Sequence, residues 1–195
     1  MHRTNYERAL EKLGHLDPAE RQLALTELSE LSELDSAEPI LPALDDTDAV
    51  VRRLAIELLT ELGDVRALPG IIARLSDDDA EVRQGAHDAL REFRGEQAAT
   101  PMLAAITHAH PEIRRGVIVG LREIKDARAT EPLLRALEDE APEVRREAVV
   151  TLGYLRTPDA VDGLRRRLRD ADEQVRRLAV GALGFSWPRR CCKTS

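Results

Sequence analysis

A spacing of 31 residues recurs through almost the whole chain of 195 residues. A Val-Arg step returns at this interval, and a small residue and then a leucine follow it at fixed distances. The steps are Val51-Arg52, Val82-Arg83, Ile113-Arg114, Val144-Arg145 and Val175-Arg176, and Glu20-Arg21 continues the series backwards. The leucines are Leu28, Leu59, Leu90, Leu121, Leu152 and Leu183. This period predicts a protein made almost entirely of one repeated element.

Residues 126–156 indicate what one unit folds into. Apolar residues at helical spacing predict a short first helix from about Asp126, which Pro132 is expected to bend beyond its first turn. A turn follows, and Pro142 suits the first position of a second helix. The second helix carries one apolar stripe, formed by Val144, Ala148, Leu152 and Leu155. Two helices of about 10 and 14 residues cannot bury their apolar faces alone, so neighbouring units must stack.

The repeat therefore predicts an all-α fold, an α-solenoid with a right-handed superhelix of six stacked two-helix repeats of 31 residues. We expect a single repeat domain over residues 1–187, with a short, disordered tail at 188–195. The repeats are expected at about 2–32, 33–63, 64–94, 95–125, 126–156 and 157–187. No apolar run is long enough to cross a membrane. The adjacent Cys191 and Cys192 cannot staple a fold, so we expect a cytoplasmic protein without a membrane partner.

Acidic residues fill the turns between paired helices, as in Asp45-Asp46-Thr47-Asp48. Carboxylates there cap the second helix and favour its positive dipole end, and a metal or a basic partner is the alternative explanation. An arginine follows each turn: Arg21, Arg52, Arg83, Arg114, Arg145 and Arg176. We expect these to form a structural ladder of Arg–Asp pairs between adjacent repeats, in preference to a phosphate site.

These features resemble a known family. The two-helix unit, the Val-Arg-x-x-Ala-x-x-x-Leu stretch and the Asp-x-Arg-Ala-x-x-Pro-Leu sequence from Asp126 to Leu133 resemble HEAT repeats. They are most similar to the short HEAT-like repeats named after phycobilisome lyases. The resemblance covers residues 2–187 and implies the solenoid fold and a structural role for the repeated arginine. For function it implies several classes, because such repeats serve scaffolds, bilin lyase subunits and an iron hydroxylase.

Catalytic chemistry is not indicated by the residues. Deoxyhypusine hydroxylase, the enzymatic relative, builds its di-iron site from His-Glu pairs, whereas the nearest match here is the single pair His87-Asp88. His108 and His110 with Glu112 could hold a metal only weakly, because such a site needs several convergent ligands. We therefore expect no catalytic residue, no cofactor and no metal, and a hydroxylase role is disfavoured. A bilin-lyase-like accessory role needs no obvious motif and stays open.

Charge is divided unevenly along the chain. Residues 1–97 carry 22 acids and 11 bases, net −11, whereas residues 98–195 carry 14 acids and 18 bases, net +4. In the later repeats, outward positions of the second helix change to arginine beside valine, glycine and tyrosine. The predicted protein-binding surface comprises Arg115, Val119, Arg122, Arg146, Val150, Tyr154 and Arg177. This composition is typical of binding hot spots, and a solvated arginine face is the alternative.

We expect a non-enzymatic scaffold that binds a protein partner, such as an acidic segment, on the concave, arginine-rich C-terminal half. The alternative is an accessory subunit of an enzyme, lyase-like or modifying a partner protein. Nucleic acid is disfavoured by the net charge of −7 and by the scarcity of aromatic residues. At the end of the last repeat, either Phe185 and Trp187 fold over the exposed helix, or that end self-associates with another chain.

Overall fold

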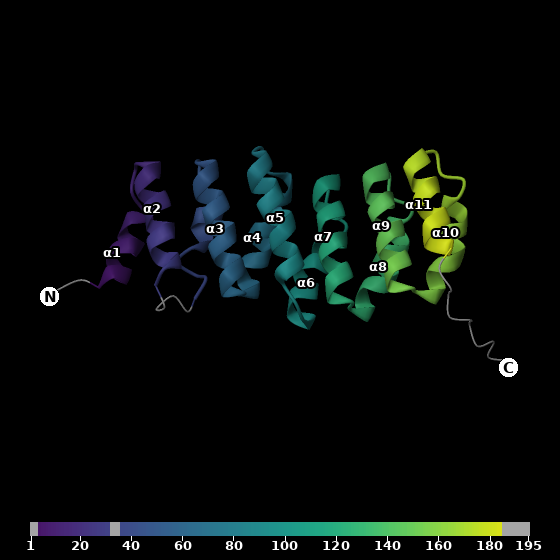
Figure 1. Ribbon diagram of the computed structural model, residues 1–195, viewed down its shortest axis with the longest axis horizontal. Helices are drawn as coiled ribbons and strands as arrows, with labels where there is room; N and C mark the ends of the chain where they lie inside the picture. Colours follow the sequence, from purple (N-terminus) through teal and green to yellow (C-terminus); the bar gives the residue numbers. More distant parts are fainter. Residues whose placement is uncertain (1–3, 32–35, 185–195) are drawn as a thin grey trace. The chain divides into compact units, whose positions relative to one another are not determined.

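The structure is a computed structural model that describes residues 4–31 and 36–184. In these residues the backbone forms helices and turns, with no strand (Figure 1). The all-α prediction is therefore confirmed. Phe185, Trp187 and the tail with its two cysteines lie outside the described residues, and so do the predictions made for them.

The chain divides into two compact units, Met1–Ala98 and Ala99–Ser195, with the boundary inside helix α6 (Glu96–Ala105). The first unit contains α1 (Asn5–Lys12), α2 (Pro18–Ser29), η1 (Leu41–Asp45), α3 (Ala49–Leu62), η2 (Val65–Ala67), α4 (Leu68–Ala73), η3 (Arg74–Ser76) and α5 (Ala80–Glu92). The second unit contains α7 (Pro111–Ile124), η4 (Ala127–Ala129), α8 (Thr130–Ala136), α9 (Pro142–Leu155), η5 (Pro158–Ala160), α10 (Val161–Arg167) and α11 (Glu173–Gly184).

The second helices of the repeats form one row in each unit. In the first unit α2, α3 and α5 lie side by side, and in the second unit α7, α9 and α11 do so (Figure 1). Each of these rows contains small residues that are completely buried: Ala55, Ala86, Ala148 and Ala179. Helices with alanine at their contacts can approach closely and pack densely. The apolar stripe read from the sequence is therefore the core of each unit.

The first helices α4, α8 and α10 have only six or seven residues and are shorter than the sequence predicts, whereas α6 has ten. In residues 126–136 the chain makes the 3₁₀ turn η4 and then only the seven residues of α8. The Asp126 carboxylate accepts the Arg128 N–H at 2.8 Å and so caps the 3₁₀ turn. Pro132 lies in the first turn of α8, where its missing N–H costs no helical hydrogen bond. The prediction of a bend beyond the first turn is wrong for this reason.

The second helices begin as the sequence predicts. Helix α9 starts at Pro142, and α7 starts at the corresponding Pro111. Where no proline is present, an aspartate caps the helix by accepting backbone N–H groups of its first turn: Asp48 for α3, Asp79 for α5 and Asp172 for α11. The capping role predicted for the acidic turns is confirmed in these three helices. Among the described residues, no helix is both long and apolar enough to span a bilayer.

Candidate protein-binding surface

An arginine near the start of α3 joins that helix to the turn of the next repeat. The Arg52 Nε and Nη2 groups donate to the two carboxylate oxygens of Asp77, at 2.9 and 2.7 Å. Its Nη1 group donates to the Asp46 carbonyl at 2.8 Å. The Arg52 and Asp77 side chains are only 8% and 2% exposed. This bidentate ion pair is nearly buried, and it fixes the helix relative to the next turn.

Three further steps have the same geometry: Arg21 with Asp46, Arg114 with Asp139, and Arg145 with Asp170. The two remaining ladder residues differ. Arg83 and Arg176 donate to carbonyl groups of their own preceding turns, and the described part of the chain gives neither an ion pair with a carboxylate. In the sequence, the residue 25 positions after Arg83 is His108, whereas an aspartate occupies that position after each of the four paired arginines.

Three aspartates of the ladder have pKa values below their ordinary value in spite of their burial: Asp46, Asp77 and Asp170. Burial raises the pKa of Asp77, but the hydrogen bonds from Arg52 and from the Asp79 N–H outweigh it, so the pKa lies below its ordinary value. The pKa values of Asp46 and Asp170 are lowered in the same way. Four of the six ladder arginines are therefore matched by an aspartate of the next turn, whereas among the residues that the structure describes Arg83 and Arg176 donate only to carbonyl groups.

His108 performs the turn role that aspartate has elsewhere. Its Nδ1 accepts the His110 N–H at 3.1 Å, just as the Asp46 carboxylate accepts the Asp48 N–H at 2.8 Å. The two imidazole rings stack with their centroids 5.5 Å apart. Across residues 4–31 and 36–184, no group of three or more His, Cys, Asp or Glu side chains is arranged to hold a metal.

The arginines of the predicted surface are paired with carboxylates of their own chain. Arg122 Nη1 lies 2.9 Å from Glu147 and so joins α7 to α9. Arg146 donates to both carboxylate oxygens of Asp172, in the turn before α11. On their own helices, Arg115 pairs with Glu112 at 3.0 Å and Arg177 with Glu173 at 2.5 Å. Much of the positive charge is thus already balanced.

The apolar members of the predicted surface differ in exposure. Val119 is only 8% exposed, because α7 buries a wide face that includes Gly116 and Gly120. Val150 is half-buried, whereas Tyr154 is 55% exposed. Val180, which was not predicted from the sequence, is 63% exposed on α11, the last described helix, whereas its equivalents Ile118 and Val149 in the 31-residue register are completely buried. Among α7, α9 and α11, the exposed large apolar side chains are therefore Tyr154 on α9 and Val180 on α11.

A hollow of about 480 Å³ opens at the C-terminal ends of α7 and α9. Its lining comprises Lys125, Asp126, Ala127, Thr130, Tyr154, Leu155 and Thr157. The Lys125 ammonium lies 5.4 Å from the centroid of the Tyr154 ring, a cation–π distance. Lys125 is not among the residues predicted from the sequence. The signal that could have identified it is that Gly63 occupies the equivalent position 62 residues earlier.

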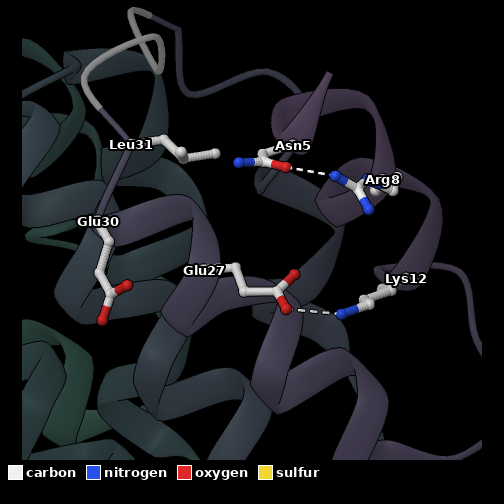
Figure 2. Close-up of a pocket in the computed structure, with 6 residues that line it drawn as sticks. All are labelled: Asn5, Arg8, Lys12, Glu27, Glu30 and Leu31. Carbon is white, nitrogen blue, oxygen red and sulfur yellow. Dashed lines mark hydrogen bonds and ion pairs between the residues drawn. The ribbon is translucent and has the colours of Figure 1, made fainter. Parts of the chain in front are cut away.

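The first unit contains a hollow of about 430 Å³ between α1 and α2 (Figure 2). Its lining comprises Asn5, Arg8, Lys12, Glu27, Glu30 and Leu31. The Lys12 ammonium donates to Glu27 at 2.6 Å, and the Arg8 guanidinium donates to the Asn5 side chain at 2.5 Å (Figure 2). Unlike Lys125, Lys12 meets a carboxylate within its own hollow.

Comparisons with known proteins agree with this architecture. A family model described as HEAT repeats matches residues 6–91, 37–110 and 99–184. A search of curated proteins finds no match. Among solved structures, the chain is similar to TOG3 of Drosophila melanogaster Mini spindles, with a TM-score of 0.69 and 14% identity over 94% of this chain and 96% of that one.

Two further solved structures have similar folds. A designed armadillo repeat protein in complex with the peptide (KR)4 gives a TM-score of 0.54 at 21% identity, over 92% of this chain and 98% of that one. The complex of CpcE and CpcF of phycocyanin lyase from Nostoc sp. PCC7120 gives 0.50 at 23% identity, over 95% and 79%. These likenesses confirm the α-solenoid class predicted from the period; the number and size of the repeats stay predictions.

Proposed function

The chain belongs to the HEAT-repeat family, and we propose that it is a non-catalytic scaffold that binds a protein partner through the row of second helices in its second unit. The fold is typical of protein-binding scaffolds. We call the proposed surface the second-helix face, and it comprises Arg115, Arg122, Arg146, Val150, Tyr154, Arg177 and Val180. Val119 was part of the sequence prediction and is left out because it is buried.

The observation that carries this proposal is the exposure of large apolar side chains among oriented arginines. Tyr154 and Val180 are each more than half exposed, although burial of apolar surface is energetically favourable. Arg146 is held in place by its two bonds to Asp172, so little side-chain entropy is lost when a partner contacts it. Tyrosine and arginine with small apolar neighbours are the residues that dominate interface energies.

Site-specific photo-crosslinking tests the proposal. A photoreactive phenylalanine analogue is placed at position 154 or 180, and as a control at position 131 on α8, where Glu131 is 70% exposed. We expect positions 154 and 180 to yield the same crosslinked protein in cells and position 131 to yield none. The double variant Arg146→Ala, Tyr154→Ala should lose this partner in a pull-down. Equal crosslinking from position 131, or unchanged recovery by the double variant, would contradict the proposal.

A second candidate is an accessory subunit of an enzyme, lyase-like or acting on a partner protein. The similarity in fold to the CpcE and CpcF complex supports it. On this alternative the purified protein would carry a chromophore or transfer one to a partner, and its visible absorbance spectrum distinguishes the two candidates. A colourless protein that still crosslinks its partner from position 154 favours the scaffold.

A further inference from the structure

Lys125 differs from the arginines of the second-helix face in its electrostatic surroundings. Arg115, Arg122, Arg146 and Arg177 each lie within ion-pair distance of a carboxylate. For Lys125, the described residues provide no carboxylate, and its ammonium lies against the Tyr154 ring instead. The one acid that lines the same hollow, Asp126, is bound by Arg128 through Nη2 at 2.7 Å. Positive charge is thus left unbalanced at this point of the surface.

The backbone at Lys125 has the left-handed conformation that also ends α3 and α9. Lys125 has a φ of 57°, in the left-handed region, and the equivalent residues Gly63 after α3 and Arg156 after α9 have φ of 64° and 51°. Glycine adopts this conformation without the steric cost that a Cβ atom brings. A base at the end of α7 interacts well with the helix dipole, but the dipole does not explain why an exposed aromatic ring lies beneath it.

The remaining lining fits one kind of side chain. Thr130 and Thr157 supply hydroxyl donors, and the Tyr154 ring, Leu155 and Ala127 supply apolar surface. A carboxylate would accept from the ammonium and the hydroxyls, while its methylene stem lies on the ring. A phosphate backbone would instead favour several unpaired arginines, and those of the second-helix face are already paired.

We propose that this hollow binds an aspartate or glutamate side chain of the partner, with Lys125 as its counter-ion and Tyr154 as the surface on which its stem packs. The inference rests on the proposed function and identifies the partner as an acidic segment. It also assigns a binding role to Lys125, which lies just past the end of α7, beside the arginine rows.

An NMR titration of the intact protein tests the inference. The probe is acetyl-tetraglutamate amide, and acetyl-tetraglutamine amide is the neutral control. We expect the glutamate peptide to shift the amide signals of residues 125–130 and 154–157, and the glutamine peptide to leave them in place. Equal shifts with both peptides would overturn the inference, because they would show that charge plays no part.

Two matched variants separate a binding role from a folding role. Lys125→Gly removes the charge and also relieves the left-handed backbone, so its melting temperature should equal or exceed that of the parent protein. We expect this variant to bind the glutamate peptide with an affinity at least fivefold lower than that of the parent protein. Arg169→Gln removes an exposed base of the same unit for which the described residues provide no carboxylate, and it should leave affinity unchanged. An unchanged affinity in Lys125→Gly would refute the inference.

A third probe covers the other class of anionic partner. If a tetrathymidine oligonucleotide shifts the same residues more strongly than the glutamate peptide does, the site recognises nucleic acid and the inference is wrong. If position 154 crosslinks a protein while the glutamate peptide fails to bind, the inference fails and the scaffold proposal stands. If position 154 crosslinks no protein and the glutamate peptide does not bind, both the inference and the scaffold proposal fail.

Discussion

At the scale of single residues, the molecule depends on arginines whose charges are used within the protein. Arg52 is almost buried, and it meets both the Asp77 carboxylate and a carbonyl group. Removal of one partner from a buried ion pair leaves an uncompensated charge, which costs more than the pair itself contributes. The ladder is therefore a device for fixing the orientation of the helices, and the residues that contact a partner must be sought elsewhere.

Truncation of a ladder arginine tests this account. We expect Arg52→Ala to lower the free energy of unfolding by about 3 kcal/mol, because it leaves the Asp77 carboxylate without its main partner. Arg83→Ala is the matched control, since Arg83 donates to carbonyl groups in the same way and has no carboxylate among the described residues. It should cost about 1 kcal/mol. Urea denaturation of both variants measures the difference, and equal losses would contradict the ladder.

The lowered pKa values of Asp46, Asp77 and Asp170 predict the response to acid. Their folded-state pKa lies below the unfolded value of about 3.9, so their contribution is fully present above that pH and is lost as the pH falls through the folded pKa. We expect the urea midpoint to be nearly constant from about pH 7 to 5 and to fall below about pH 4. In Arg52→Ala the fall should be smaller, and a midpoint that rises in acid would contradict this explanation.

At the scale of the elements, the distance between neighbouring helices is set by small residues. A Cβ atom at Gly153 on α9 would lie 2.8 Å from the Ala182 Cβ and 3.3 Å from its Cα on α11. A methyl group cannot be accommodated there unless the two helices separate. A Cβ at Gly181, in contrast, would meet nothing within 4 Å. Both glycines lie within second helices, but only Gly153 lies at a tight helix–helix contact. The two therefore make a matched pair of positions for substitution.

We expect Gly153→Ala to destabilise the protein by about 1–3 kcal/mol, because overpacking pushes α9 and α11 apart. Gly181→Ala should stabilise it by about 0.5–1 kcal/mol, because alanine loses less backbone entropy in a helix. Chemical denaturation of the two variants gives both signs in one experiment. If both substitutions stabilise the protein, this result would contradict the conclusion that α9 and α11 are tightly packed at Gly153.

The period of the sequence predicts the elements better than it predicts their surfaces. It gives the start of α9 at Pro142, because proline and the apolar stripe are local signals. It does not predict that Val119 is buried, since a register position defines a face of one helix and not how closely its surroundings cover that face. It also does not predict that α8 has only seven residues after a 3₁₀ turn that the Asp126 side chain caps.

At the scale of the whole molecule, the net charge of −7 conceals two different halves, and residues 98–195 carry net +4. An acidic partner of the kind proposed would therefore be attracted to the part of the chain that contains the second-helix face. Such long-range attraction acts mainly on association and is screened by salt. We expect the association rate of the partner crosslinked at position 154 to fall severalfold between about 50 and 300 mM salt, with little change in dissociation. Stopped-flow kinetics measures both rates, and an association rate that is independent of salt would contradict steering.

The central claim is that a protein partner binds the second-helix face, and hydrogen–deuterium exchange with and without that partner tests it most directly. The account predicts slower exchange on binding in residues 122–130, 146–157 and 173–184, which contain Lys125, Tyr154 and Val180. Exchange in α8 from residue 131 onward and in α10 should change little. Protection confined to α8 and α10, or to residues 4–31 and 36–98, would contradict the claim.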